Sequence, residues 1–274
     1  MNLSKFTYAY NRLGIVGFIN VLLGKIGIRF RFDSPLIKLI SFHSKRIEKL
    51  TKKKIIGGFY EGTKLNLNKK WSRLDGASKY LGLYEYEVQD EISKIQNNYK
   101  IKRKYLINIG AGDGFHALGL LKKKYFNKAI LFEKDFQASN LILLNAKLNG
   151  LKNNIELFEE ATINFLNNVN LNYKLKDCLF LIDIEGEEFK LLNTTNLKLL
   201  SKSILVIEIH DFYGSPIPLR KRLDKYFKIK SVTTGKRDLS KYKILDEIHD
   251  NEKWLVVNED RPKKMEWLIC TPKI

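Results

Sequence analysis

The sequence has few cysteines and prolines and no long uninterrupted apolar run. Only two cysteines occur among 274 residues, Cys178 and Cys270, and both lie within apolar stretches. This placement indicates reduced, buried thiols rather than a disulfide framework. Such cysteine usage is typical of an intracellular chain, so a cytoplasmic location is expected.

The apolar stretch nearest the N-terminus, residues 14–28, is too short for a membrane span, which needs about 20 residues. It contains Lys25 and lacks the small-residue cleavage site of a signal peptide. We expect an amphipathic segment that packs on the body of the protein. Peripheral contact with a membrane surface and pairing of subunits in a homo-oligomer are the alternatives.

Acidic residues are also scarce, with 30 Asp and Glu against 49 Lys and Arg, which gives a net charge of +19. The basic clusters recur along the chain at 45–54, 100–104, 121–124, 219–222 and 261–264. This even spread favours a compositional bias, or weak attraction to acidic surfaces, over a dedicated nucleic-acid groove. A nucleic-acid partner is therefore disfavoured but stays open.

From residue 104 onward, short apolar runs alternate with helical patterns, which is typical of a parallel sheet with helices on both faces. The expected parallel strands are 105–110, 128–133, 154–161, 178–186 and 203–211. After a helix at 217–227, further strands are expected near 227–234, 253–258 and 265–271. The predicted fold class is α/β, with a mostly parallel sheet that carries an antiparallel edge hairpin.

The part of the chain before the sheet has a different pattern. Residues 1–53 are expected to be helical, with short strands at 53–60 and 63–68. We therefore divide the chain into an N-terminal extension of helices and a short hairpin, residues 1–78, and a main domain, residues 79–274.

Three glycines interrupt the stretch LINIGAGDGFHALGLL, at Gly110, Gly112 and Gly114. A glycine-rich turn between a strand and a helix lets backbone N–H groups approach a ligand closely. Dinucleotide binders have the spacing G-x-G-x-x-G, whose third glycine would fall here on Phe115. The spacing G-x-G-x-G, with Asn108 just before it, is typical of Rossmann-like class I methyltransferases. It predicts S-adenosylmethionine as cofactor.

Glu133 ends the second predicted strand, 23 residues after Gly110 (133 − 110 = 23). A carboxylate at that place can accept hydrogen bonds from both ribose hydroxyls of a nucleoside. Further contacts with the cofactor are expected at Asn108 and Asp183. Tyr84 is expected over its methionine part, and Glu160 and Ala161 beside its adenine.

The segment LFLIDIEGEEFKLL, residues 179–192, resembles the D-x-E-G-x-E signature of the FkbM-type methyltransferases. The matching residues are Asp183, Glu185, Gly186 and Glu188. LGLYEYEV, the pair Asn145 and Asn149, and LVIEIHD are similar to further family segments, so the resemblance covers about residues 80–211. Where the family has Asp, Asn and Lys, this chain has Asn108, Gly112 and Leu181. The resemblance implies methyl transfer to a hydroxyl oxygen, with a sugar, a glycan or a related small molecule as acceptor.

The candidate catalytic residues follow the fourth and fifth strands. Asp183 and Glu185 are two positions apart and point to the same side, as do Glu208 and His210. If these strands are neighbours, the side chains converge. Deprotonation of the acceptor hydroxyl is assigned to Asp183, Glu185 and His210. The candidate acceptor contacts are Glu208, Asp211 and Arg261.

Mg²⁺ prefers oxygen ligands, so these carboxylates could also hold a divalent metal. We nevertheless expect metal-free catalysis. Two other functions stay open: a ribose 2′-O-methyltransferase acting on RNA, and a methyltransferase-fold interaction subunit without catalysis. Methylases of base amino groups are disfavoured because their N/D-P-P-aromatic turn is absent at residues 183–186.

Overall fold

The computed structural model describes residues 3–26, 33–67, 74–170, 172–259, 261 and 263–273. Its centre is a seven-stranded sheet in the order β3-β2-β1-β4-β5-β7-β6. The strands are β1 (Tyr105–Ile109), β2 (Lys128–Phe132), β3 (Ile155–Phe158), β4 (Cys178–Ile182), β5 (Ile204–Ile209), β6 (Phe227–Thr233) and β7 (Glu266–Pro272). The first five are parallel, and β7 runs antiparallel to both β5 and β6. The predicted fold class, with its antiparallel edge pair, is confirmed.

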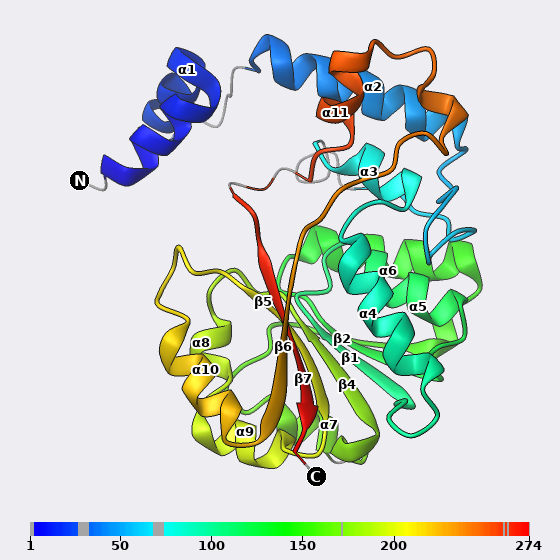
Figure 1. Cartoon of the computed structure of the whole chain (residues 1–274), viewed down its shortest axis with the longest axis vertical. Helices are drawn as coiled ribbons and strands as arrows, with labels where there is room; N and C mark the ends of the chain where they lie inside the picture. The colour runs from blue at the N-terminus through cyan, green and yellow to red at the C-terminus, as the bar shows by residue number, and fades with distance from the viewer. Residues whose placement is uncertain are drawn as a thin grey trace.

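Helices cover both faces of the sheet (Figure 1). One layer contains α4 (Tyr86–Asn97), α5 (Phe115–Lys122) and α6 (Phe136–Asn149), and the other contains α7 (Leu166–Asn170), α8 (Glu188–Leu191), α9 (Thr194–Leu200) and α10 (Ile217–Asp224). Beyond the carboxyl ends of the strands lie α2 (Pro35–Leu50), α3 (Gly76–Leu81) and α11 (Asp250–Val256). Because both faces are covered, β4 and β5 are buried along their whole length.

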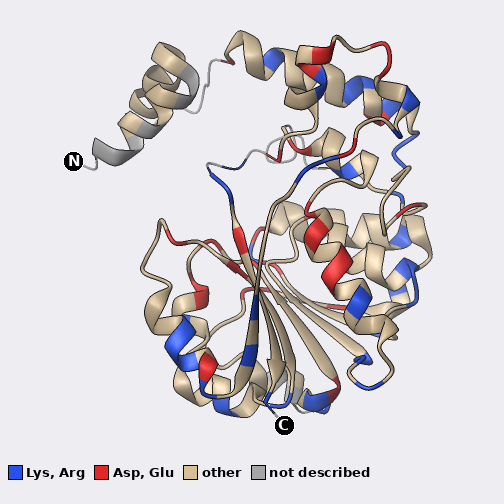
Figure 2. Cartoon of the chain, in the orientation of Figure 1, with Lys and Arg blue, Asp and Glu red and all other residues tan. Residues whose placement is uncertain are grey.

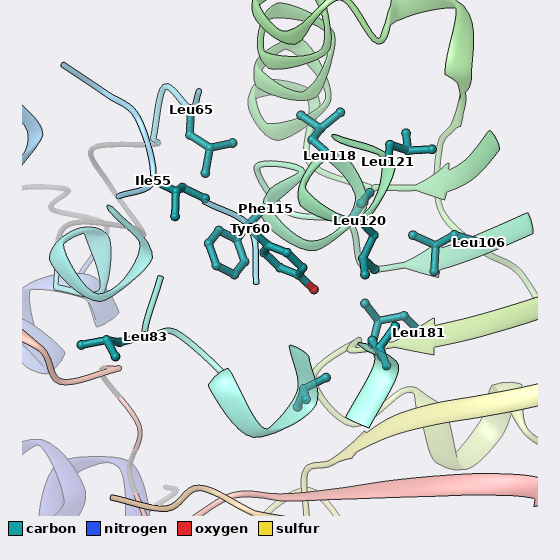
Figure 3. Close-up of a cluster of buried hydrophobic side chains, with 14 of the residues drawn as sticks. Ile55, Tyr60, Leu65, Leu83, Leu106, Phe115, Leu118, Leu120, Leu121 and Leu181 are labelled. Atoms are coloured by element: carbon teal, nitrogen blue, oxygen red, sulfur yellow. The ribbon is translucent and has the colours of Figure 1, made fainter. Parts of the chain in front are cut away.

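The segment before the sheet shares a hydrophobic core with it. Ile55, Tyr60 and Leu65 pack with side chains of α5 and of the central strands (Figure 3). Gly119 of α5 lies directly against the ring of Tyr60. A Cβ atom at Gly119 would lie 2.3 Å from Cγ of Tyr60.

This contact gives a stability prediction. The Gly119→Ala substitution adds helix propensity worth about 1 kcal/mol, but Tyr60 is fully buried and cannot move without cost. We expect a net loss of about 1–2 kcal/mol in the free energy of unfolding, measured by urea denaturation. Gly24→Ala is the control, since a Cβ there meets nothing within 4 Å. A Gly119→Ala variant as stable as the native chain would contradict the packing.

Two asparagines of α6 attach the N-terminal segment to the main domain. Asn145 accepts from the backbone N–H of Asn66 at 2.7 Å and donates to the carbonyl of Asn66 at 3.0 Å. Asn149 makes the corresponding pair of bonds with the backbone of Lys64, at 2.9 and 2.7 Å. The two side chains thus bind residues 64–66 much as a neighbouring strand would, four residues apart on one helix face.

Several sequence-based expectations about secondary structure are wrong. Residues 253–258 were expected to be a strand but largely belong to α11, which begins with Asp250 and Glu252 in its first turn and is capped by His249. The strands expected at 53–60 and 63–68 reduce, in the described part, to one bridge between Lys54 and Lys64. At residues 64–66, side-chain hydrogen bonds from Asn145 and Asn149 of α6 take the place of a partner strand.

The buried face of helix α6 is not its leucine face. The spacing of Leu141, Leu144 and Leu148 would suit an apolar face, yet Leu144 and Leu148 are each 44% exposed. The buried residues are Ala138, Ile142, Asn145 and Ala146. Gly150, with φ of +70°, ends the helix.

Candidate active site at the carboxyl ends of the strands

The glycine loop follows β1 and leads into α5. Gly110, Gly112 and Gly114 all have positive φ, at 79°, 59° and 83°. A Cβ atom at Gly110 would lie 1.8 Å from the carbonyl oxygen of Asp183, so no side chain fits there. The loop therefore exposes bare backbone at the end of the central strand, as the sequence predicted.

Glu133 lies directly against this loop. Its Oε2 atom accepts from the N–H of Gly112 at 2.7 Å, and its Oε1 atom accepts from the N–H of Asp135 at 2.8 Å. Each carboxylate oxygen has a further lone pair that can accept another hydrogen bond. Loop and carboxylate thus form one preorganised polar surface for a hydroxylated ligand.

A cavity of about 480 Å³ opens in front of the loop. This volume is typical of small-molecule sites. Every residue predicted to bind the cofactor lines the cavity except Gly114; these are Tyr84, Asn108, Gly110, Gly112, Glu133, Glu160, Ala161 and Asp183. Glu185 of the predicted catalytic set lines it too, together with Trp267 of β7 and His116 of α5.

The expected convergence of β4 and β5 is observed, since the two strands are parallel neighbours. The Nε2 atom of His210 lies 3.4 Å from Asp183, 3.5 Å from Glu208 and 3.7 Å from Glu185. His210 and Glu208 are buried, whereas the side chain of Glu185 is 69% exposed. Acceptor access to this cluster is therefore through Asp183 and Glu185.

Glu188, the last acid of D-x-E-G-x-E, has a structural role that the sequence did not reveal. It is fully buried and accepts from the backbone N–H of Gly186 at 2.8 Å and of His210 at 3.1 Å. Its Oε1 atom also lies 3.2 Å from Nδ1 of His210. Glu188 thereby orients the imidazole, whose other nitrogen faces the three carboxylates.

The surroundings of the cluster raise the pKa values of Asp183, Glu208 and His210. Burial, followed by the charges of Glu208 and Glu85, raises the pKa of Asp183 well above the usual carboxyl range. Burial and Glu85 likewise raise the pKa of Glu208, against the effect of Arg261. Burial would lower the pKa of His210, but the bond to Glu188 and the nearby carboxylates outweigh it and raise that pKa.

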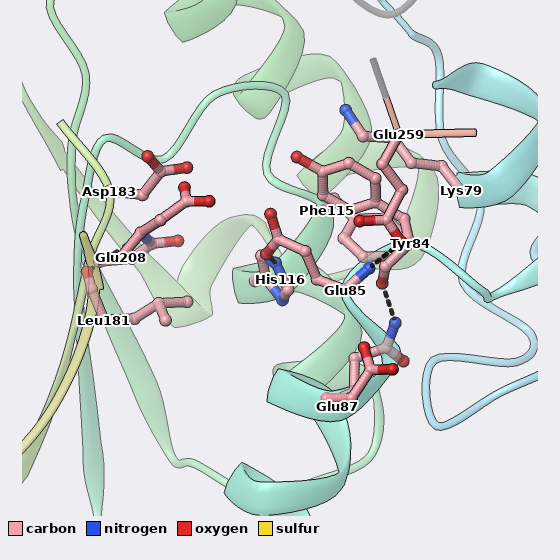
Figure 4. A network of polar contacts seen from close by, with 12 residues as sticks. Lys79, Tyr84, Glu85, Glu87, Phe115, His116, Leu181, Asp183, Glu208 and Glu259 are labelled. Carbon is pink, nitrogen blue, oxygen red and sulfur yellow. Dashed lines mark hydrogen bonds and ion pairs between the residues drawn. The ribbon is translucent and has the colours of Figure 1, made fainter. Parts of the chain in front are cut away.

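Arg261 belongs to a network of ion pairs around Glu85, and Figure 4 shows Glu85 beside His116. Its guanidinium pairs with Glu85 and Glu208 and lies 2.8 Å from Glu259. Glu85 also pairs with His116 at 2.7 Å. Burial would raise the pKa of Glu85, but Arg261 and His116 bring it down to about 2. This network was not predictable from the sequence, because Glu85 and Arg261 are 176 positions apart.

Lys79 forms a second buried network beside the loop. Its Nζ atom lies 2.8 Å from Asp113 and 3.2 Å from Asp75, and all three side chains line the cavity. Asp113 also accepts from the N–H of Phe115 at 3.2 Å. These contacts connect α3 to the first turn of α5 and hold the glycine loop in place.

Two residues of the cavity wall adopt the left-handed backbone conformation that favours glycine. Glu85 has φ of 48° and Glu185 has φ of 53°. Such positions cost roughly 1–3 kcal/mol and tend to cluster at functional sites. In both cases the strained residue carries one of the acids of the site.

The remaining predicted acceptor contacts lie outside the cavity lining. Glu208 and Arg261 are behind it and are paired with each other, and Asp211 is paired with Lys263 at 2.5 Å. His210 is also behind the lining, in contact with Asp183 and Glu185.

Among the residues that the structure describes, two groups of side chains could hold a divalent cation. Asp183, Glu185 and His210 form one, and Glu85, Asp183 and Glu208 form the other, with ligand atoms within 4.8 Å of one another. Arg261, and His210 with its raised pKa, compete with a metal for the same carboxylates. The cluster is therefore neutralised in part by the chain itself.

Comparisons with known proteins identify solved structures that have a similar fold. No protein-family model matches the chain, and no curated protein matches it. Among solved structures, the METTL16 MTase domain is 12% identical and has a TM-score of 0.53, over 83% of this chain and 80% of that one. Its delta-N form is 13% identical, with a TM-score of 0.52 over 83% and 96%.

A further similar structure is Sp1610 of Streptococcus pneumoniae, a proposed tRNA (m1A22) methyltransferase solved with S-adenosyl-L-methionine. It is 14% identical with a TM-score of 0.44, over 67% of this chain and 72% of that one. Together with the strand order, the similarity to the METTL16 domain defines the class: the chain has the Rossmann-like class I methyltransferase fold. The resemblance to the FkbM type stays a prediction.

Proposed function

We propose that this protein is an S-adenosylmethionine-dependent O-methyltransferase of FkbM type that acts on a hydroxyl of a sugar, a glycan or a related metabolite. The observation that carries the proposal is the contact between the glycine loop and Glu133, in the same cavity as Asp183. It combines a bare backbone, a nucleoside-binding carboxylate and a candidate base within one small-molecule site.

The residues present fit the cofactor. A Cβ at Gly110 would collide with the backbone of Asp183, so only glycine lets the loop run this close to the end of β4. Glu133 retains acceptor capacity for the ribose hydroxyls. Ala161 and Glu160 lie at the end where the adenine is assigned, and Tyr84 at the methionine end. When bound, the cofactor supplies an activated methyl group on a positively charged sulfur. The acids of the site complement that charge.

Asp183 is the proposed general base. It lines the cavity, and its raised pKa brings its basicity closer to that needed to remove a hydroxyl proton. His210, oriented by Glu188, stabilises the negative charge of Asp183 and Glu185 from behind. Glu185 and Asp183 hold the acceptor hydroxyl in line for the displacement.

The mouth of the site favours a neutral, hydroxyl-rich acceptor. Glu185, Glu187 and Asp183 line the cavity. Outside the lining, Phe212 and Tyr213 are 47% and 63% exposed, and the ring of Phe212 lies beside His210, with centroids 5.6 Å apart. Tyr213 lies beside Gly186, where an added Cβ would come within 2.7 Å of it. Carboxylates accept from hydroxyls and repel phosphates, and aromatic faces pack on apolar patches of a sugar.

The distribution of basic residues agrees with this assignment. Lys and Arg are scattered over several helices and strand ends, whereas many acids lie near the carboxyl ends of the strands (Figure 2). A polyanionic RNA would need several phosphate contacts around the active site, where the exposed Lys134 of the cavity lining stands against the exposed Glu160, Glu185 and Glu187. The ribose 2′-O-methyltransferase is therefore the second candidate.

The function is tested by incubating the chain with isotope-labelled cofactor and a panel of neutral oligosaccharides, acidic oligosaccharides and RNA. Mass spectrometry should show a labelled O-methyl group on a neutral sugar. Label on RNA alone would replace the glycan assignment by the second candidate. Cofactor binding without product on any acceptor would favour the non-catalytic interaction subunit.

The pH dependence of turnover tests the base. Asp183 must be unprotonated to accept a proton, so kcat/KM should fall about tenfold per pH unit as the pH is lowered below the pKa of Asp183. Because that pKa is raised, the fall should begin at a pH above the usual carboxyl range. A pH–rate profile measured with saturating cofactor gives the midpoint. An acid limb at the ordinary pKa of an exposed carboxyl would contradict the burial argument.

Metal removal tests the charge balance. Because Arg261 and His210 supply positive charge to the acids, we expect EDTA to leave turnover within about twofold of the untreated enzyme. The measurement is the initial rate after dialysis against EDTA, with and without added Mg²⁺. Loss of activity that Mg²⁺ restores would show that the carboxylates need a metal.

A further inference from the structure

The first helix, α1 (Leu3–Lys25), is folded back on itself. Gly14 interrupts it with φ of 60° and ψ of −146°. The rings of Phe6 and Phe18 have centroids 5.2 Å apart, whereas twelve residues of straight helix would separate them by about 18 Å. Lys25 also lies 4.3 Å from the ring centroid of Phe6. The two halves of α1 therefore form a helical hairpin.

The second half of this hairpin has an exposed apolar stripe. Ile15 is 63% exposed, Phe18 39%, Leu22 46% and Ile26, directly after the helix, 64%. At 100° per residue, these positions fall within an arc of roughly 80°. Figure 1 shows α1 apart from the sheet and its helices. The expected packing of this stripe on the body of the protein is therefore not observed.

The charge of the segment points to one kind of partner. The first 32 residues contain no Asp or Glu, and their cations are Lys5, Arg12, Lys25, Arg29 and Arg31. A basic segment with an apolar stripe matches an anionic lipid surface, where the stripe enters the acyl boundary and the cations meet headgroups. Among the described residues, no helix has the length and apolar character to cross a membrane.

We propose that the α1 hairpin is a peripheral membrane anchor, which lies in the plane of an anionic lipid surface with Ile15, Phe18, Leu22 and Ile26 inserted. The inference is independent of the proposed activity, because it uses no residue of the cavity. The two alternatives considered for this segment, the body of the protein and a second copy of the chain, carry less support. The stripe is exposed on the folded chain, and pairing of two copies would bring equal positive charges together.

The test is co-sedimentation of the full-length chain with vesicles of phosphatidylcholine and phosphatidylglycerol at a ratio of about 7:3, and with phosphatidylcholine alone. The chain should bind the anionic vesicles, less at high salt, and bind the neutral vesicles weakly. Leu22→Glu should reduce binding about tenfold or more. Leu199→Glu on α9 introduces the same charge at a residue that is 51% exposed, and it should change binding little.

If the two variants lost vesicle binding equally, the loss would follow from the change in net charge alone, and the proposal would be overturned. Binding that Leu22→Glu leaves unchanged, or a native chain that does not bind anionic vesicles, would also overturn it. Analytical ultracentrifugation of the same samples distinguishes membrane binding from pairing of two copies of the chain. A dimer that Leu22→Glu dissociates, without vesicle binding by the native chain, would assign the stripe to self-association. Matching thermal unfolding curves confirm that both variants are folded.

Discussion

The Asp183→Asn variant should bind S-adenosylmethionine almost as well as the native enzyme and lose about 10²–10⁴-fold in turnover. Asn keeps the shape of the side chain and can still accept a hydrogen bond, but it cannot take the hydroxyl proton. The expected loss is large because Asp183 combines a place in the cavity lining, contact with His210 and a raised pKa. Turnover is measured with the acceptor identified by the labelling panel, and cofactor affinity by calorimetry.

A matched control lies next to the opposite end of the same strand. Asp177→Asn makes the same chemical change directly before β4, at the opposite end of the sheet from the site. It should leave both turnover and affinity near the native values. Full activity of Asp183→Asn would remove Asp183 from the mechanism, whereas a parallel loss of cofactor affinity would show that its role is in binding.

The Glu133→Ala variant should weaken cofactor binding by about 1–3 kcal/mol, or roughly 5–150-fold in Kd. The carboxylate is assigned to the ribose hydroxyls, and it also accepts from the N–H groups of Gly112 and Asp135. Its removal therefore costs both the ligand contact and part of the order of the loop. Calorimetric titration of S-adenosylmethionine into each variant measures the change.

Glu159→Ala serves as the comparison for Glu133. Glu159 directly follows β3, is exposed, and does not line the cavity. Its substitution should leave the affinity unchanged. If Glu133→Ala also binds the cofactor like the native chain, the ribose has been assigned to the wrong residue, even though the loop geometry is as described.

Local sequence patterns predicted the architecture well where the position of a residue has a direct structural consequence. The G-x-G-x-G spacing predicted a bare loop because only glycine adopts positive φ without cost, and all three glycines do so. The neighbouring strand end brought Glu133 to that loop because consecutive parallel strands place their carboxyl ends at one edge. The same rule predicted the convergence of the acids of β4 and β5.

Contacts between distant segments were not predictable. Arg261 reaches Glu85 and Glu208 from a loop after α11, and nothing in the local sequence specifies that partner. Gly119 packs against a tyrosine 59 positions earlier (119 − 60 = 59), which the local sequence of the helix does not specify. The apolar run in 253–258 is compatible with a strand as well as with a helix. The first turn of α11, which His249 caps, is the local feature that favours the helix.

Calorimetry of S-adenosylmethionine with the full-length native chain tests the central claim most directly. The account predicts saturable binding at one site per chain, accompanied by a rise in the thermal unfolding temperature. It also predicts that Glu133→Ala shifts both readouts together. A folded chain that shows neither heat of binding nor thermal stabilisation at millimolar cofactor would contradict the assignment of the loop between residues 110 and 114.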